Sequence, residues 1–194
     1  GSGGLRVTSA EQLDQAARFE FSPNVPLILR ASLGASNAMV DLGGLTLEEL
    51  SISAGATRSV VQFSEPTRGQ CREATFTAGA GELVVERLPQ SGCGTIHLEG
   101  GVGRTLLDFS GEWRNDIRVE ADVSIGTVVL RVPRGIGLNI AADRFLTSIN
   151  ADGMQRSERG WETADFATAG RKITVALRAA VAGIVVEWLE PATR

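Results

Sequence analysis

Three acidic residues, Asp108, Glu112 and Asp116, stand at intervals of four and are the first candidates for chemistry. Two carboxylates held about 5–9 Å apart could serve as acid and base in glycoside hydrolysis. The Ser110-Gly111 pair between them favours a turn rather than a shared helix face. We therefore expect solvated strand ends here, and a carbohydrate-active enzyme is the less favoured alternative.

Two further features invite a chemical interpretation. Residues 99–105, Glu-Gly-Gly-Val-Gly-Arg-Thr, are rich in glycine but lack the GxxxxGK[ST] spacing and the lysine of a phosphate-binding loop. His97 lies between Ile96 and Leu98, so its side chain is expected to point away from an apolar face. No acid is placed to complete a Ser-His-Asp set with it. We predict no catalytic residues and no bound cofactor.

The composition narrows the class of protein further. The 194 residues include one His, two Cys and no Tyr, which excludes a His-rich metal site, a Cys-rich zinc site and a tyrosine acid. The net charge of −4 argues against a nucleic-acid footprint. Apolar residues make up 43%, enough for a packed core, yet no apolar stretch reaches the roughly 18–20 residues of a membrane helix.

A small residue recurs along the chain and defines a column, at intervals of 21, 24, 22, 23, 21 and 36 residues. Alternating apolar residues precede most of its members and β-branched runs follow, which indicates two short strands bent at the small residue. We predict an all-β fold, a single-stranded parallel β-solenoid of about seven coils with a ~22-residue repeat. An antiparallel sandwich is the alternative. The column is Ser36, Thr57, Gly81, Gly103, Gly126, Thr147 and Gly183.

The repeat places the two cysteines. Cys71 and Cys93 each lie ten residues before a column glycine, so they occupy the same position of consecutive coils. Equivalent residues of stacked coils are about 5 Å apart, which fits a disulfide. A disulfide would indicate an oxidising compartment, whereas two buried thiols are the alternative. The same register argument makes Asp41, Glu86 and Asp108, each five residues after the column, an outward face.

These patterns divide the chain into four parts. Residues 1–4 are expected to be a remnant of an expression tag, and residues 5–26 an N-terminal cap. The cap is either a helix starting with the capping box Ser9–Gln12 or a strand at residues 18–21. Residues 27–194 form the solenoid, with an insertion at about 152–171 that leaves the regular coil, most simply to cap an apolar edge.

Two of the three tryptophans are the remaining candidates for contact with a partner. Trp113 follows a turn and Trp161 lies in the insertion, so both are considered for surface contact, with edge packing as the simpler role. Trp188 alternates with Val186 near the chain end and is expected to cover the last coil.

Residues 41–50, 100–109 and 126–137 resemble the bacterial toast-rack domains. These β-solenoids are related to the C-terminal region of LiaF-type cell-wall-antibiotic response proteins and to adhesins. The resemblance covers about residues 25–189 and implies exported or membrane-anchored proteins, with no catalytic residues to carry over. Residues 145–150, Phe-Leu-Thr-Ser-Ile-Asn, depart from the pattern because the family often places glycine before the serine.

The resemblance and the residues together imply a non-catalytic, extracytoplasmic module of a bacterial cell-envelope protein, in the periplasm or at the cell surface. Its expected role is protein interaction or envelope-stress sensing, and a surface adhesin or a carbohydrate-active enzyme is the alternative. The expected partner is another envelope protein or a surface ligand, not nucleic acid. We expect contact with a membrane only through an anchor outside this sequence.

Overall fold

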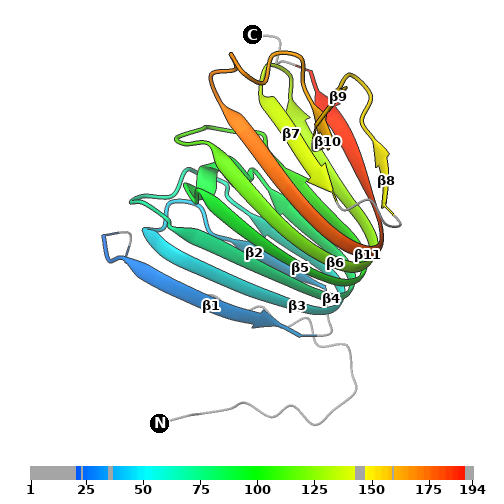
Figure 1. The fold of residues 1–194 in the computed structure, drawn as a ribbon. Coiled ribbons are helices and arrows are strands. Elements are labelled where there is room, and N and C mark those ends of the chain that lie inside the picture. Colours follow the sequence, from blue (N-terminus) through cyan, green and yellow to red (C-terminus); the bar gives the residue numbers. More distant parts are fainter. Residues whose placement is uncertain (1–20, 23, 35–36, 143–146, 159, 191–194) are drawn as a thin grey trace.

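The computed structural model describes residues 21–22, 24–34, 37–142, 147–158 and 160–190. They form an eleven-stranded sheet of mostly parallel strands (Figure 1). The predicted cap helix or strand, column residue Ser36 and residues 143–146 of the atypical repeat lie wholly or largely outside the described part.

The long strands form the body of the sheet, and one 3-10 helix, η1 (Leu88–Ser91), lies between two of them. No helix in the described part of the chain is long and apolar enough to cross a membrane. The strands are β1 (Leu27–Leu33), β2 (Ala38–Asp41), β3 (Leu47–Gln62), β4 (Glu73–Glu86), β5 (Thr95–Asp108), β6 (Ile117–Pro133), β7 (Gly137–Ala142), β8 (Thr147–Asn150), β9 (Gln155–Ser157), β10 (Gly160–Glu162) and β11 (Lys172–Leu189).

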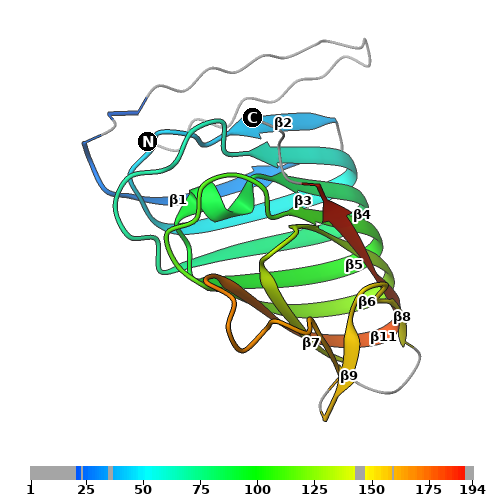
Figure 2. The same ribbon diagram turned by 90° about the horizontal axis from the view of Figure 1, so that it is seen from above.

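The long strands bend where the small residues recur. Thr57, Gly81, Gly103 and Gly126 are register partners in β3 to β6, so this part of the predicted column is confirmed. Their φ angles are 130°, 121°, 148° and 154°, in a region of backbone conformation that residues other than glycine rarely adopt. The bend divides each strand into two limbs, and Figure 2 shows the successive strands curving in the same sense.

The C-terminal end of the predicted column is only partly correct. The sheet order is β1-β3-β4-β5-β6-β11-β7-β10-β9, so the last long strand lies between β6 and β7. Gly126 therefore pairs with Ala182, which occupies the column in place of Gly183, and the predicted column residue Thr147 follows as the partner of Ala182. A strand that is apolar on its inner face buries more surface between two neighbours than at an edge. The insertion provides the residues with which the chain returns from the edge of the sheet to a position beside β6.

The core fills the concave side of the bent sheet. Alternate residues of both limbs point inward, as shown by Ile96, Leu98 and Leu107 of β5, which are at most 1% exposed. Phe63 and Phe109, which lie in loops, and Leu88 of η1 are completely buried and belong to the same core cluster. They fill the space between the two limbs of the bent sheet. A functional site is therefore sought on the outer faces of the limbs.

A disulfide joins two of the loops that cover the core. Cys71 and Cys93 are bonded, with their Cα atoms 4.4 Å apart, as the repeat predicted. Both residues are buried. The bond crosses between neighbouring layers of the stack and so fixes the register of β4 against β5.

The insertion folds back on the edge of the sheet. β9 and β10 form an antiparallel pair, and β10 pairs antiparallel with β7. This arrangement covers the free edge of β7 with a short hairpin, a common protection of an exposed edge strand. The insertion thus leaves the regular coil and lies along a sheet edge.

Candidate functional site

The three spaced carboxylates have separate partners. The carboxylate of Asp108 accepts hydrogen bonds from the backbone N–H and the hydroxyl of Ser110, at 2.8 and 3.0 Å. The carboxylate of Asp116 accepts one from the backbone N–H of Lys172 at 3.0 Å, and Glu112 is exposed. Each acid thus serves its own turn or strand end, and the arrangement favours a structural role over a catalytic pair.

The expected outward charged face is only partly correct. Asp41 is exposed, Glu86 is half-buried and Asp108 is buried, because Asp108 ends β5 beneath the turn that Ser110 begins. Burial raises the pKa of Asp41, but hydrogen bonds from the backbone of Gly43 and from Ser64 outweigh it and leave the pKa below its usual value. Asp41 therefore stays ionised while it ties a turn to the next layer.

The glycine-rich segment 99–105 is the bend of β5 and not a phosphate loop. A Cβ atom at Gly101 would lie 2.1 Å from the carbonyl oxygen of Gly79, and one at Gly103 only 1.9 Å from that of Gly81. The glycines are therefore needed for close approach of neighbouring strands. They offer no loop of free backbone N–H groups to an anion.

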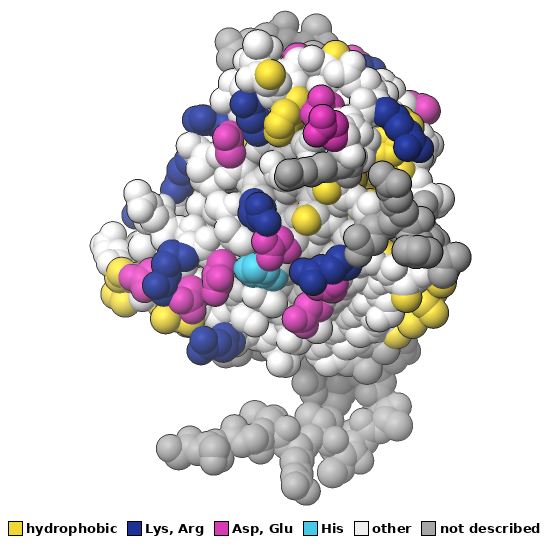
Figure 3. Space-filling view, viewed as in Figure 1, with side chains coloured by type: hydrophobic (Ala, Val, Ile, Leu, Met, Phe, Trp, Pro, Cys, Tyr) yellow, Lys and Arg dark blue, Asp and Glu magenta, His cyan; other side chains and the backbone are white. Residues whose placement is uncertain are grey.

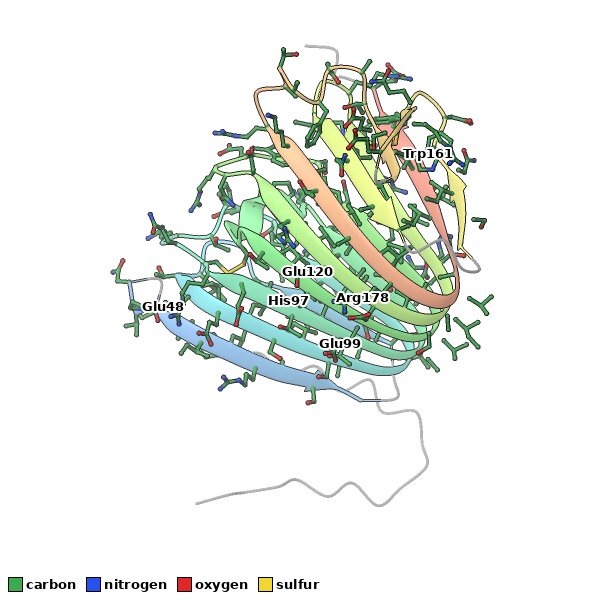
Figure 4. All side chains as sticks on the ribbon, viewed as in Figure 1. Glu48, His97, Glu99, Glu120, Trp161 and Arg178 are labelled. Carbon is green, nitrogen blue, oxygen red and sulfur yellow. A yellow bond between two sulfur atoms is a disulfide. The ribbon has the colours of Figure 1, made fainter. Side chains whose placement is uncertain are left out.

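His97 lies on the outer face of the first limb, as expected, between the carboxylates of Glu73 and Glu120, and Figure 4 labels His97 and Glu120. Its Nε2 is 3.7 Å from Glu73 and its Nδ1 is 3.5 Å from Glu120. A hydrogen bond from Arg118 to Glu120, of 2.8 Å, lowers the pKa of Glu120 despite slight desolvation. These solvated pairs form a ladder of charges across the surface strands. Exposed ion pairs of this kind contribute little to the stability of the fold.

No group of three or more His, Cys, Asp or Glu suited to a metal ion occurs among the residues that the structure describes. The outer face of the first limb instead carries further paired charges, such as Arg178 with Asp122 at 3.5 Å. This face is polar and most of its charges lie beside an opposite charge, which leaves no strong field to steer a charged ligand.

The tryptophans are half-buried and have partners within the chain. Trp113 stacks on Phe109, with ring centroids 6.3 Å apart, and packs against the core. The guanidinium of Arg156 lies 5.1 Å from the Trp161 ring centroid, within the hairpin. The packing favours the structural role for both, while their contact with a partner remains a prediction.

Trp188 belongs to β11, which is an interior strand and not the last coil of the stack. Its Nε1–H donates a hydrogen bond of 2.7 Å to the carbonyl of Asp152, at the start of the insertion. The side chain also packs against the core. It therefore anchors the loop that leads to the hairpin.

A row of exposed apolar side chains runs along the convex bend of the sheet, and we call it the bend ridge. It consists of Ala80, Val102, Ile125 and Val181, which are register partners in β4, β5, β6 and β11. Val102 is 55%, Ile125 51% and Val181 50% exposed. Figure 3 shows apolar side chains gathered at the right-hand edge, over this bend.

The bend ridge is bordered by small residues and then by charges. Immediately before it along each strand come Gly79, Gly101, Ser124 and Ala180, and immediately after it Gly81, Gly103, Gly126 and Ala182. A shallow depression beside it is lined by residues that include Thr127 and Ser148. Contiguous exposed apolar side chains are a feature of interaction surfaces, and these lie side by side on neighbouring strands. The alternation of residues in the sequence did not reveal this surface.

Residues 6–86 match the family described as "N-terminal domain of toast_rack, DUF2154", which confirms the resemblance found in the sequence. A solved structure described as "a putative cell adhesion protein" from Clostridium sporogenes is similar to this chain with a TM-score of 0.58. The match has 15% identity and covers 80% of this chain and 94% of that one, so it shows the fold alone. No protein among the curated sequences matches.

Proposed function

We propose that this chain, with its toast-rack N-terminal region, is a non-catalytic protein-interaction module of a bacterial cell-envelope protein, outside the cytoplasm. The bend ridge carries the proposal, because a stable scaffold has little reason to expose aliphatic side chains in a straight row unless they bind. Envelope-stress sensing would use the same surface, since a sensor must also bind what it reports.

The scaffold itself supports a binding role. We infer that each long strand and its return loop form one coil of a single-stranded β-solenoid, in which β1 with β2 and β7 with β8 each count as one coil. Such a stack is rigid, buries a continuous core and presents long, regular surfaces. Partners are then recognised on its outside.

The extracytoplasmic location rests on two supports. The Cys71–Cys93 disulfide fits an oxidising compartment. The structural neighbour is described as a cell adhesion protein, which keeps a surface adhesin as the second candidate function. Adhesion would require that the ridge or a neighbouring face bind a molecule of another cell or surface.

Photo-cross-linking in living cells tests the proposal directly. The full-length protein is produced with p-benzoylphenylalanine at position 125 on the ridge or, as a matched exposed control, at position 118 on the polar limb. Position 125 should give discrete protein adducts that position 118 does not. If neither position gives adducts, or both give the same set, the bend ridge is not the interaction surface and the proposal fails.

A further inference from the structure

We propose that the outer edge of β1 binds the N-terminal segment of this same chain, residues 16–21, as one further antiparallel strand. The edge is a different surface from the bend ridge, so the inference goes beyond the proposed function and does not depend on it. Three observations carry it: a partly covered end of the core, a turn that leads the chain back along β1, and the alternation of side chains before that turn.

The end of the stack at β1 is only partly covered by the residues that the structure describes. β1 comes first in the sheet order, and in the described part of the chain its only neighbour is β3 (Figure 1). The inward-facing residues of β1 are half-buried, whereas Leu50 and Ile52 on β3 are at most 2% exposed. One further layer of side chains would bury this end of the core. The residues that it would cover are Leu27, Leu29, Ala31 and Leu33.

The opposite end of the sheet shows how this fold closes a first-limb edge. There the hairpin of β9 and β10 lies antiparallel along β7. A bare strand edge can pair with other chains, and natural proteins commonly cover it. We expect an antiparallel strand to cover the edge of β1 in the same way.

A turn directly before β1 sets the direction of the segment that precedes it. The backbone N–H of Val25 donates a hydrogen bond of 3.4 Å to the carbonyl oxygen of Ser22, and that of Asn24 donates one of 3.5 Å to the Ser22 hydroxyl. A bond between residues three apart reverses the chain. β3 already occupies the other side of β1, so the reversed segment meets the outer edge.

The residues before the turn alternate as a strand at this edge requires. Ala17, Phe19 and Phe21 are apolar, whereas Arg18 and Glu20 between them are charged. A strand with this pattern places its apolar face on the end of the core and its charged face in water. Phe21 is 44% exposed, so it still has apolar surface to bury.

The length of the loop sets the register of the added strand. A five-residue loop over 22–26, built around the turn, is a common hairpin connection. It places Phe19 opposite Leu29 on the core side and Glu20 opposite Ile28 on the outer side. A slip by one residue would turn the charged side chains of the segment toward the core.

The charges on the outer side are compatible with this register. Arg18 faces Arg30, and the carboxylate of Glu49 lies 3.9 Å from Arg30. Glu20 takes the diagonal position beside Arg30, so two carboxylates accompany the two guanidinium groups. All these groups lie at the surface, where such pairs contribute little energy. The register is therefore determined by the apolar face.

Two observations select this segment over a separate chain as the occupant. Only five residues join it to β1, so its effective concentration at the edge is on the order of millimolar. The match to the toast-rack N-terminal domain begins at residue 6, so the segment belongs to the same domain as β1 to β4. Once bound, it blocks the edge against strands of other proteins.

Pairs of introduced cysteines test the direction and the register. Glu20→Cys with Ile28→Cys, and Ala16→Cys with Ser32→Cys, should each form an intramolecular disulfide under mild oxidation, because the members of each pair face each other on the outer side. The crossed pairs, Ala16→Cys with Ile28→Cys and Glu20→Cys with Ser32→Cys, should give at least about tenfold less. Mass analysis of each product checks that Cys71 and Cys93 remain joined to each other.

The crossed pairs are matched controls for sequence separation. Their members are 12 residues apart, and those of the direct pairs are 8 and 16 apart. A segment without a fixed place would form disulfides according to separation alone, so it would favour the crossed pairs over positions 16 and 32. Direct pairs that yield no more than the crossed pairs would overturn the inference. Disulfides formed mainly between two chains would overturn it as well, because a second copy would then occupy the edge.

Hydrogen exchange of the unaltered chain gives a measurement that needs no introduced cysteine. Backbone amides within residues 16–21 that pair with β1 should exchange at least about tenfold more slowly than in the Phe19→Asp variant, because a carboxylate at position 19 cannot lie against the core. Gln12→Asp, which adds the same charge outside the segment, should leave the exchange unchanged. Equal rates in the unaltered chain and in Phe19→Asp, or protection confined to residues 9–17 as in the alternative cap helix, would contradict the added strand.

Discussion

Replacing Gly103 by alanine should strongly destabilise the protein, because this glycine meets two demands at once. Its φ angle is 148°, and a Cβ atom would lie 1.9 Å from the carbonyl oxygen of Gly81 on the neighbouring strand. The first demand concerns the residue's own backbone. The second concerns the separation of β4 and β5 at the bend.

The two contributions can be estimated separately. Holding a non-glycine residue in such a backbone region costs about 1–3 kcal/mol. Forcing a methyl group into a packed contact that must open by more than 1 Å costs about 1–3 kcal/mol more. The sum, about 2–6 kcal/mol, should lower the melting temperature by about 5–20 °C in a domain of this size.

Thermal unfolding followed by circular dichroism measures the effect, and two other glycines separate its parts. Gly135 has a φ of 86° and no atom within 4 Å of the place a Cβ would take, so Gly135→Ala should show the backbone cost alone. Gly170 has neither constraint, so Gly170→Ala should change the free energy of unfolding by about 0.5 kcal/mol or less. If Gly103→Ala loses no more stability than Gly135→Ala, close strand approach is not what requires glycine in the column.

Three further outcomes follow from features of the same stack. Thr57→Gly should raise the melting temperature, because Thr57 is held at a φ of 130° and the relief of about 1–3 kcal/mol exceeds the ~0.5–1 kcal/mol that glycine costs; unchanged or lower stability would contradict this. Cys71→Ser with Cys93→Ser should cost about 3 kcal/mol for a loop of 22 residues, measured by urea unfolding, and alkylation of protein from cells without reduction should label neither native cysteine. Trp113→Ala should lower the melting temperature far more than Trp161→Ala, because only Trp113 packs against the core; equal shifts would show that the hairpin is equally part of the core.

The period of the sequence was enough to predict most of the stack. Gly81, Gly103 and Gly126 fix the register because only small residues fit a bend whose neighbours lie so close. Once that register is known, Cys71 and Cys93 must meet, since no insertion interrupts the chain between them. Where consecutive repeats are also neighbours in space, the spacing of residues along the sequence directly gives the pairing of the strands.

The same reasoning could not give the order of the last strands. Residues 137–142 and 172–177 have the same alternation of apolar and polar positions, so each could pair with β6. Spacing carries no information about which of two equivalent strands lies next to a given edge. That choice depends on total burial and on the path of the insertion, which are properties of the whole fold.

The bend ridge could not be predicted from the sequence because the bend changes the alternation of side chains. Counting by twos from Ile96 and Leu98 places Val102 inside, yet it is 55% exposed. The register omits the Gly79–Gly101 pair, and residues beyond the bend, such as Leu107, are again inside with the opposite parity. One extra residue at the bend of each strand thus turns an apparent core position into a surface position.

The position of β11 has a consequence for the order in which the chain can assemble. As the chain emerges from its N-terminus, β3 to β6 can each stack on the strand before, but β7 and β8 find their partner only when residues 172–189 have appeared. β11 then pairs with β6 on one side and with β7 and β8 on the other, and the pairing with β6 joins residues 56 positions apart, such as Arg131 and Glu187. Early layers form from local contacts, whereas the final closure is a long-range event and should set the overall folding rate. A nascent chain paused before β11 therefore presents the bare edge of β6 to chaperones and to its neighbours.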